Sequence, residues 1–257
     1  MYHPLPYSKL RSFAKGPLEL IRLNAAEREI FDALIAQQDQ RGDPGHVSTV
    51  VYFTQQLGRL MGLNSLEQEA VNIAAIVHDA GWVLIPQINE IWSTLATDAH
   101  SDDLVRVRIA KEKMAELRNI HEQEAVRLVR ELIPSHPMME QVAVAVGDHD
   151  TRKNKPPEIF KAFYDADWMW RSTVFSRLAK SSGVYDSQSA EAVFARLKVE
   201  GTQSDFLIPW AYVIFRIEVA NTILALQKLQ SWQTLPTEFM VDYEAEISEI
   251  DSANRGE

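Results

Sequence analysis

The chain has 257 residues, of which 46% are apolar and 24% charged, and this size and composition are typical of a soluble globular protein with a substantial core. The formal charge of -10 argues against a sequence-independent nucleic-acid surface, because such a surface gains affinity by neutralising phosphates. The absence of cysteine excludes disulfides, thiolate zinc sites and cysteine nucleophiles. No segment has the apolar run of a membrane span or signal peptide, so we expect a cytoplasmic protein that binds neither membrane nor nucleic acid.

Apolar residues recur every three or four positions along most of the chain, and no stretch of any length shows the alternation of a strand. The sequence therefore predicts an all-α protein. Residues 1–23 are expected to form an irregular arm, and residues 251–257 a frayed tail. Helices are expected at 25–38, 46–61, 65–78, 102–117, 119–132, 138–146, 156–178, 187–197 and 206–229.

Two capping signals mark helix starts. Ser65 with Gln68 predicts a capping box, and Asn119 with Glu122 predicts a further helix start, which divides residues 102–132 into two helices. Residues 82–100 show little periodicity, and we expect a loop or short helices there, near the functional site. Whether that segment closes as a lid is left open.

An adjacent His78–Asp79 pair ends an apolar helix within Val71–Trp82, which reads VNIAAIVHDAGW. Burial of two polar groups costs roughly 2–7 kcal/mol for each group that lacks a partner. A metal ion would satisfy both groups. Other candidates to join such a site lie at a helix end or on an apolar helix face, namely His46, His121, His149 and Asp167.

Helical phase separates two acids in the helix that follows Pro156 and Pro157. Asp167 falls on the same stripe as the apolar residues of this helix, such as Phe163. At about 100° per residue, Asp165 is rotated about 200° away from Asp167. We therefore expect Asp167 at the site, and interpret Asp165 as a solvated acid or one that supports a ligand.

Imidazole and carboxylate ligands together favour a divalent transition metal such as Mn, Fe, Co, Ni or Zn over Ca, with Mg also possible. Such an ion lowers the pKa of bound water to about 7 and polarises a phosphoryl or carbonyl oxygen. The sequence leaves open whether one ion or two are bound. With two, the carboxylate of Asp79 is suited to bridge them, because it has two oxygens.

The order His46, His78–Asp79 and Asp167 resembles the HD-domain superfamily of metal-dependent phosphohydrolases, whose pattern is a His, an adjacent His-Asp and a distant Asp on separate helices. The segment Tyr164–Trp168, YDADW, resembles the Ala-Asp motif that closes the metal site of this family. The resemblance implies an HD-domain helical bundle.

Within one domain at 1–257, the resemblance covers a core at about 46–170. The N-terminal arm at 1–45 and the C-terminal helices at 171–250 would flank this core. His121 and His149 match positions where binuclear members of the family carry two further histidines.

Three departures argue against cleavage of cyclic di-GMP. Trp82 replaces a lysine that often follows the His-Asp pair in that branch, and its Gly-Tyr-Pro motif is absent after His149. Asp148–His149 replaces a doubled histidine. The ligand set of a second metal therefore stays open.

The resemblance implies that metal-activated water hydrolyses a small phosphate ester or nucleotide, with Asp79 as the catalytic residue that orients or deprotonates the nucleophile. Arg152, Lys153 and Lys155 follow His149 and could bind the phosphate of the substrate, since cations stabilise charge that grows in the transition state. The alternative for these three side chains is a solvated basic loop.

Two rival functions remain. The same ligand set resembles the di-iron oxygenases of the superfamily, the myo-inositol oxygenase type, which use two irons and O₂ to cleave a C–C or C–P bond. A regulatory or binding module that keeps the fold without turnover is the third possibility. The sequence does not choose among them, and it leaves the oligomeric state unknown.

Overall fold

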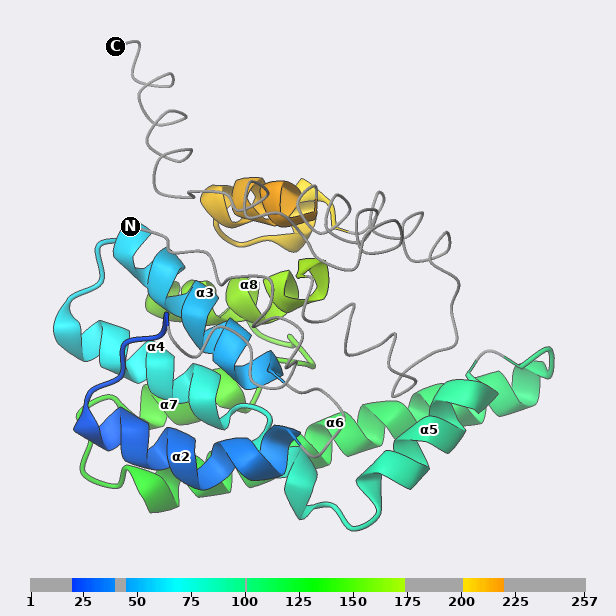
Figure 1. Ribbon diagram of the computed structural model, residues 1–257. Helices are drawn as coiled ribbons and strands as arrows, with labels where there is room; N and C mark the ends of the chain where they lie inside the picture. Colours follow the sequence, from blue (N-terminus) through cyan, green and yellow to red (C-terminus); the bar gives the residue numbers. More distant parts are fainter. Residues whose placement is uncertain (1–19, 40–44, 100, 174–200, 220–257) are drawn as a thin grey trace, which may run out of the picture.

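The computed structural model describes residues 20–39, 45–99, 101–173 and 201–219. As predicted, the protein is an all-α bundle, and no residue in these ranges forms a strand (Figure 1). The α-helices are α2 (Ala25–Asp39), α3 (His46–Leu60), α4 (Ser65–Val77), α5 (Ile88–Asp98), α6 (Leu104–Leu132), α7 (Met139–Val146) and α8 (Lys161–Met169). The 3₁₀ helices are η1 (Ala80–Leu84), η2 (Glu158–Phe160), η3 (Trp170–Ser172) and η5 (Gln203–Asp205). Residues 209–219 are also helical.

Helix α4 lies at the centre of this bundle. Every residue from Ala70 to Val77 is buried, and α2, α3, α7 and α8 all pack against the helix. A helix that is apolar on all sides is stable only when it is covered on all sides. The two residues that follow it, His78 and Asp79, are therefore carried into the interior.

Two groups of helices meet at the C-terminal end of α4. Helices α3 and α8 pack side by side along one side of it, and α6 packs with α7 and η1 on the other (Figure 1). His46 begins α3 and Asp167 lies on α8, whereas His121 lies on α6 and His149 follows α7. Each group of helices thus brings its own side chains to one point.

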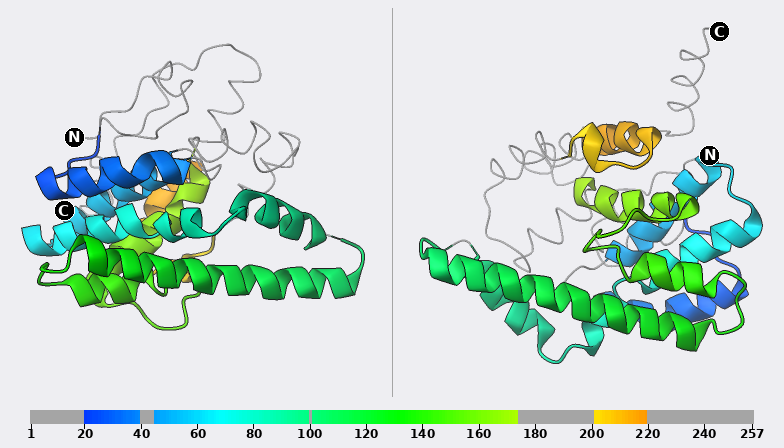
Figure 2. Two further views of the ribbon diagram at one scale, coloured as in Figure 1. Left: turned by 90° about the horizontal axis from the view of Figure 1, so that it is seen from below. Right: turned by 180° about the vertical axis from the view of Figure 1, so that it is seen from behind.

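Helix α6 is a single helix of 29 residues, which corresponds to roughly 43 Å. Its N-terminal half projects from the bundle with α5 packed along it (Figure 2). The predicted division into two helices at Asn119 is wrong. No glycine or proline interrupts residues 104–132, and the Asn119 side-chain amide donates to the carbonyl oxygen of Ala115 at 2.9 Å instead of capping a new helix.

The capping box of α4 lies one residue before the predicted one. The Asn64 side chain accepts hydrogen bonds from the N–H groups of Leu66 and Glu67, and the Glu67 carboxylate accepts from the Asn64 N–H at 2.9 Å. Ser65 is the first helical residue, and Gln68 donates to the side chain of Asn72 rather than to the cap. The helix itself begins where the sequence predicts.

The helix expected over 156–178 is interrupted at Thr173, and its residues 174–178 lie outside the described ranges. Residues 158–160 form η2, α8 follows, and η3 is the last turn, because Thr173 is extended with ψ at 152°. The hydroxyl groups of Ser172 and Thr173 donate to the carbonyl oxygens of Met169 and Trp170 at 2.7 and 2.8 Å, and these bonds close the last turn.

Short helices replace a plain loop between α4 and α6, as expected, since η1 and α5 occupy most of residues 80–99. The described end of the N-terminal arm packs on α3, where Arg22 and Gln55 exchange two hydrogen bonds of 3.0 and 2.7 Å. Residues 1–19, the helix expected at 187–197 and the tail expected at 251–257 lie outside the described ranges. Within the described ranges, no helix combines the length and the apolar character that crossing a bilayer requires.

Candidate metal centre

A first group of donor atoms lies between α3, the end of α4 and α8. The Nε2 atom of His46 is 3.0 Å from Nε2 of His78, 3.2 Å from Oδ2 of Asp79 and 3.4 Å from Oδ1 of Asp167. The Nε2 atom of His78 is 3.7 Å from each of the same two carboxylate oxygens. All four side chains are buried.

A second group lies between the end of α4, α6 and the turn after α7. The Nε2 atoms of His121 and His149 are 3.3 Å apart, and they lie 4.0 and 3.8 Å from Oδ1 of Asp79. The Oδ2 atom of Asp150 is 3.6 Å from Nε2 of His121. Both histidines are fully buried, whereas the side chain of Asp150 is 26% exposed.

Asp79 joins the two groups, because its two carboxylate oxygens face different pairs of histidines. Three donors in each group lie within 4.8 Å of one another, and each group could hold a metal ion. The first consists of His46, His78 and Asp79, and the second of Asp79, His121 and His149.

Hydrogen bonds fix the orientation of two of these histidines. The Nδ1 atom of His78 lies 2.9 Å from the carbonyl oxygen of Ala75, and Nδ1 of His149 lies 2.7 Å from that of Val146. Because a carbonyl oxygen only accepts, Nδ1 carries the proton, and in the neutral ring the lone pair is on Nε2, which faces the cluster. Facing Nε2 atoms with converging carboxylates form a donor set that fits a divalent transition metal.

Burial and charge act in opposite directions on these groups. Burial lowers the pKa of His78 to about 4, although the charge of Asp79 opposes the shift. Burial also acts to lower the pKa of His149, but the hydrogen bond to Asp79 and the charge of Asp150 raise it to about 9. The pKa of Asp167 is lowered, because the nearby histidines outweigh the effect of burial. A cation bound at the cluster would compete with protons for the imidazole nitrogens.

Glu122 holds the turn that carries His149. Its Oε1 atom accepts from the N–H groups of Asp150 and Thr151 at 3.0 and 2.9 Å, and the Thr151 hydroxyl donates to the same carboxylate. Glu122 is only 2% exposed, and this burial raises its pKa. The sequence assigned Glu122 to a helix cap and so missed its role in positioning the turn.

Asp148 closes the same turn from the other end. Its two carboxylate oxygens accept from the N–H groups of Lys153 and Asn154 at 2.8 and 2.7 Å, and Oδ1 also accepts from the Thr151 hydroxyl. A buried carboxylate that accepts several backbone donors makes a turn rigid. Asp148, which precedes His149, therefore stabilises the backbone conformation of the turn.

The three basic residues predicted to bind substrate lie exposed on this turn. The guanidinium of Arg152 donates to the backbone carbonyls of His149 and Tyr164 at 3.2 and 3.0 Å. The ammonium of Lys153 donates to a side-chain oxygen on α6 at 2.6 Å. The substrate-binding role of Arg152, Lys153 and Lys155 stays a prediction.

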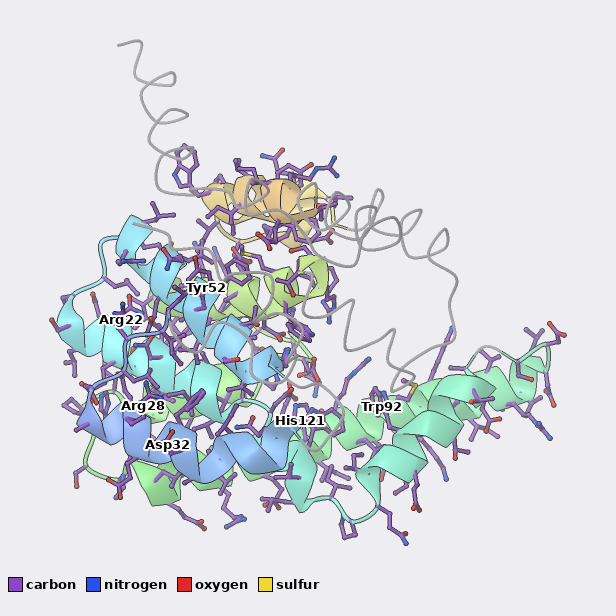
Figure 3. The ribbon with its side chains drawn as sticks, viewed as in Figure 1. Arg22, Arg28, Asp32, Tyr52, Trp92 and His121 are labelled. Atoms are coloured by element: carbon purple, nitrogen blue, oxygen red, sulfur yellow. The ribbon has the colours of Figure 1, made fainter. Side chains whose placement is uncertain are left out.

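An aromatic ring covers the second group. Trp82 stacks on His121 with ring centroids 4.0 Å apart and planes 11° apart, and Trp92 of α5 packs against Trp82 edge to face. Figure 3 labels His121 toward the bundle and Trp92 further out along the pair of helices α5 and α6. Gly81 permits this approach, because a Cβ atom there would overlap the backbone carbonyl of His121.

The structure brings together all six residues that the sequence proposed as metal ligands, although their role as ligands stays a prediction: His46, His78, Asp79, His121, His149 and Asp167. Helical phase placed Asp167 correctly. Of the two interpretations of Asp165, the solvated acid is wrong, because this residue is fully buried, while a role in supporting a ligand stays a prediction. Asp150 was not among the predicted ligands, although the sequence carries a signal for it, an acid directly after a candidate histidine.

No family model, curated protein or solved structure matches this chain. The geometry of the cluster is therefore the basis on which a function can be assigned.

Proposed function

We propose that this protein is a metal-dependent phosphohydrolase of the HD-domain type, acting on a small phosphate ester or nucleotide. One observation carries the proposal: the two oxygens of Asp79 face two separate pairs of histidine Nε2 atoms. A carboxylate between two such pairs is suited to bridge two metal ions. Paired ions that clamp both the attacking and the leaving oxygen are a recurring arrangement in phosphoryl transfer.

The ions would be drawn from Mn, Fe, Co, Ni and Zn, with Mg also possible. When bound, they would lower the pKa of water to about 7 and neutralise charge on the phosphate. One ion would be held by His46, His78, Asp79 and Asp167, and the other by Asp79, His121 and His149.

The side chains of this chain position the reactants and exclude water. Asp79 fixes the separation of the two groups and orients the nucleophile between them. Phe163 lies 5.4 Å from the ring of His78, and Trp82 covers His121, so that apolar surface shields the imidazoles from solvent. Shielding strengthens the attraction between the cluster and an anionic substrate.

The turn after His149 carries three exposed basic side chains, those of Arg152, Lys153 and Lys155. In the proposed complex, Lys153 and Lys155 contact the phosphate of the substrate, while Arg152 holds the turn in place through its bonds to backbone carbonyls. These exposed cations also attract an anion toward a chain whose overall formal charge is -10.

The first test combines elemental analysis of the purified protein with assays on p-nitrophenyl phosphate and a panel of nucleotides. We expect two transition-metal ions per chain and hydrolysis, and we expect Asp79→Ala to lose both. His136→Ala, an alanine substitution in the turn between α6 and α7, is the control and should keep both. Two bound ions without hydrolysis of any phosphate ester would refute the proposal.

A di-iron oxygenase is the second candidate, and the observation that favours it is the presence of two histidines in each half of the cluster. Nitrogen-rich sites with a bridging carboxylate suit iron as well as Mn or Zn. Two irons per chain, absence of hydrolysis and O₂ consumption with a polyol or phosphonate would favour this function. Hydrolysis supported by redox-inactive Zn would exclude the need for O₂.

A further inference from the structure

The dipeptide His-Asp occurs twice in the chain, as His78–Asp79 after α4 and as His149–Asp150 after α7. Both copies follow an apolar helix that buries residues of its last turns, Ala74 to Val77 in α4 and Val142, Ala143, Ala145 and Val146 in α7. In both, Nδ1 of the histidine bonds the carbonyl oxygen three residues earlier, so that Nε2 faces the cluster. The two copies therefore present the same local geometry to the site from different helices.

The two halves of the cluster become alike when Asp150 is included. In the first half, Asp167 adds a carboxylate that Asp79 does not share, with Oδ1 3.4 Å from Nε2 of His46. In the second half, the corresponding position beside His121 is held by Asp150, with Oδ2 3.6 Å from Nε2. Each half then contains two imidazoles, one carboxylate of its own and one oxygen of Asp79.

From this correspondence we propose that Asp150 is a carboxylate ligand of the second metal ion, together with Asp79, His121 and His149. The inference deepens the proposed function and rests on its binuclear site. A hydrogen bond already positions the residue, because the N–H of Asp150 donates to Oε1 of the buried Glu122 at 3.0 Å. The side chain thus starts from a fixed backbone.

Charge and coordination both favour this assignment. Two divalent cations together with the carboxylates of Asp79, Asp150 and Asp167 give the centre a net charge of about +1 when the imidazoles are neutral. This positive charge still attracts a phosphate. Four protein donors for each ion leave open positions on metals that prefer about six ligands. The side chain of Asp150 is 26% exposed, compared with 12% for that of Asp167.

The rival role for Asp150 is electrostatic only: its negative charge would attract His121 or the cations, and its oxygens would not bind a metal ion. Asp150→Asn and Asp150→His separate the two roles. Both remove the negative charge, but only His supplies a strong ligand atom for a transition metal. The matched control for charge alone is Glu124→Gln, at a half-exposed position of α6 three residues after His121, where the carboxylate pairs with Arg127 at 2.9 Å.

The test is a titration of the full-length apo protein with Mn²⁺, monitored by calorimetry and by electron paramagnetic resonance. Wild type and Glu124→Gln should bind two Mn²⁺ and give the spectrum of a magnetically coupled pair. Asp150→Asn should bind the first Mn²⁺ as wild type does and the second at least about tenfold more weakly, with the coupled spectrum lost. Asp150→His should bind the second ion more tightly than Asp150→Asn.

Several outcomes would overturn the inference. They are binding of a single Mn²⁺ by wild type, an affinity for the second Mn²⁺ that Asp150→Asn leaves unchanged, and an equal loss of affinity for the second Mn²⁺ in Asp150→Asn and Asp150→His. Thermal unfolding of each apo variant checks that folding is retained. If Asp150→Asn fails to fold, Asp150→His is compared with wild type alone. A His variant that still binds the second ion supports ligation by residue 150, and one that loses this ion entirely counts against it.

These measurements need no substrate, so the two proposals fail separately. Two Mn²⁺ that depend on Asp150, without hydrolysis of any phosphate ester, would refute the proposed function and support this inference. Phosphate-ester hydrolysis by a protein whose two Mn²⁺ affinities are indifferent to Asp150→Asn would support the function and refute the inference.

Discussion

The carboxylate of Asp165 accepts the backbone N–H of Leu207, 42 residues later in the chain, at 3.0 and 3.1 Å from its two oxygens. The Oδ2 atom also accepts from the N–H of Ile208 at 2.8 Å. Asp165 is fully buried and lies two residues before the candidate ligand Asp167 on α8. One helix thus uses one acid to anchor residues 201–219 and another to build the cluster.

Asp165→Ala should destabilise the fold without emptying the metal centre. It leaves the N–H groups of Leu207 and Ile208 without their acceptor, and each buried unsatisfied group costs about 1–3 kcal/mol. Asp165→Asn should be milder, since a single oxygen already accepts from both groups. Urea unfolding measures the loss, and Mn²⁺ titration should show wild-type affinity.

Asp167→Asn is the matched comparison and should give the reverse pattern. The apo fold should lose less stability than in Asp165→Ala, because the carboxylate faces His46 and His78 rather than backbone donors, while affinity for one Mn²⁺ should fall by at least about tenfold. If both acids affected stability and metal affinity alike, the division of roles on α8 would be wrong.

Helical phase was enough to predict most of the cluster. The apolar period of α4 placed His78 and Asp79 in the interior, and that of α8 selected Asp167 over Asp165 for the site. Phase did not reveal that Asp165 is buried too, because its partners belong to a segment about forty residues later in the chain. Local pattern reports which face of a helix points inward but not what lies against the opposite face.

The two errors in helix starts both involve polar residues that could act as N-caps. Asn64 and Ser65 are both good N-caps, and Asn64 holds the cap because its side-chain oxygen reaches two N–H groups. Asn119 resembles a cap in sequence, but with no glycine or proline nearby the helix continues through it. Single-residue signals therefore predict that a helix exists better than where it begins.

Gly81→Ala should disturb the second half of the cluster from the backbone side. Its Cβ would overlap the carbonyl of His121, so that η1 and α6 must separate, and overpacking of this kind costs about 1–3 kcal/mol. The separation also lifts Trp82 from the imidazole of His121. We expect a lower free energy of unfolding and weaker binding of the second Mn²⁺, with the first retained.

Gly62→Ala is the control for a glycine substitution. Gly62 has φ of +70° with open space around it, so that alanine there costs about 1 kcal/mol through backbone strain alone. Both Mn²⁺ affinities should stay at wild-type values. A Gly81→Ala protein that also binds both ions normally would show that the approach of η1 to α6 does not position His121.

Glu122→Ala should loosen the turn that carries His149 and Asp150. The N–H groups of Asp150 and Thr151 would lose their shared acceptor, which predicts a loss of about 1–3 kcal/mol in urea unfolding. Glu122→Gln should recover much of it, because one oxygen accepts from both groups. Glu124→Ala on the same helix is the exposed control and should change stability by less than about 1 kcal/mol.

Removal of metal should lower the stability of the whole protein. The cluster joins α3, α4, α6, α8 and the turn after α7, so metal ions should bind the folded chain and not the unfolded one. Such ions stabilise the folded chain by about 2.7 kcal/mol at a free concentration one hundred times Kd. Dialysis against EDTA should lower Tm, and added Mn²⁺ or Zn²⁺ should restore it. His46→Ala together with His121→Ala should make Tm insensitive to both treatments, and a persistent response would place the stabilising metal elsewhere.

Glu27 should give a pH dependence of stability that is separate from the metal centre. Burial raises its pKa, although hydrogen bonds from Asn72 and from the N–H of Asn24 oppose the shift. Because the folded state holds this proton more tightly than the unfolded state, the contribution of Glu27 is fully present below about pH 4.3, the ordinary value, and is lost as pH rises through the raised pKa. The difference in unfolding free energy between wild type and Glu27→Gln, measured in urea from pH 4 to 7, should therefore fall with pH. Glu29→Gln, at an exposed position of the same helix, controls for the change of charge, and a wild-type advantage that grows with pH would contradict the assignment.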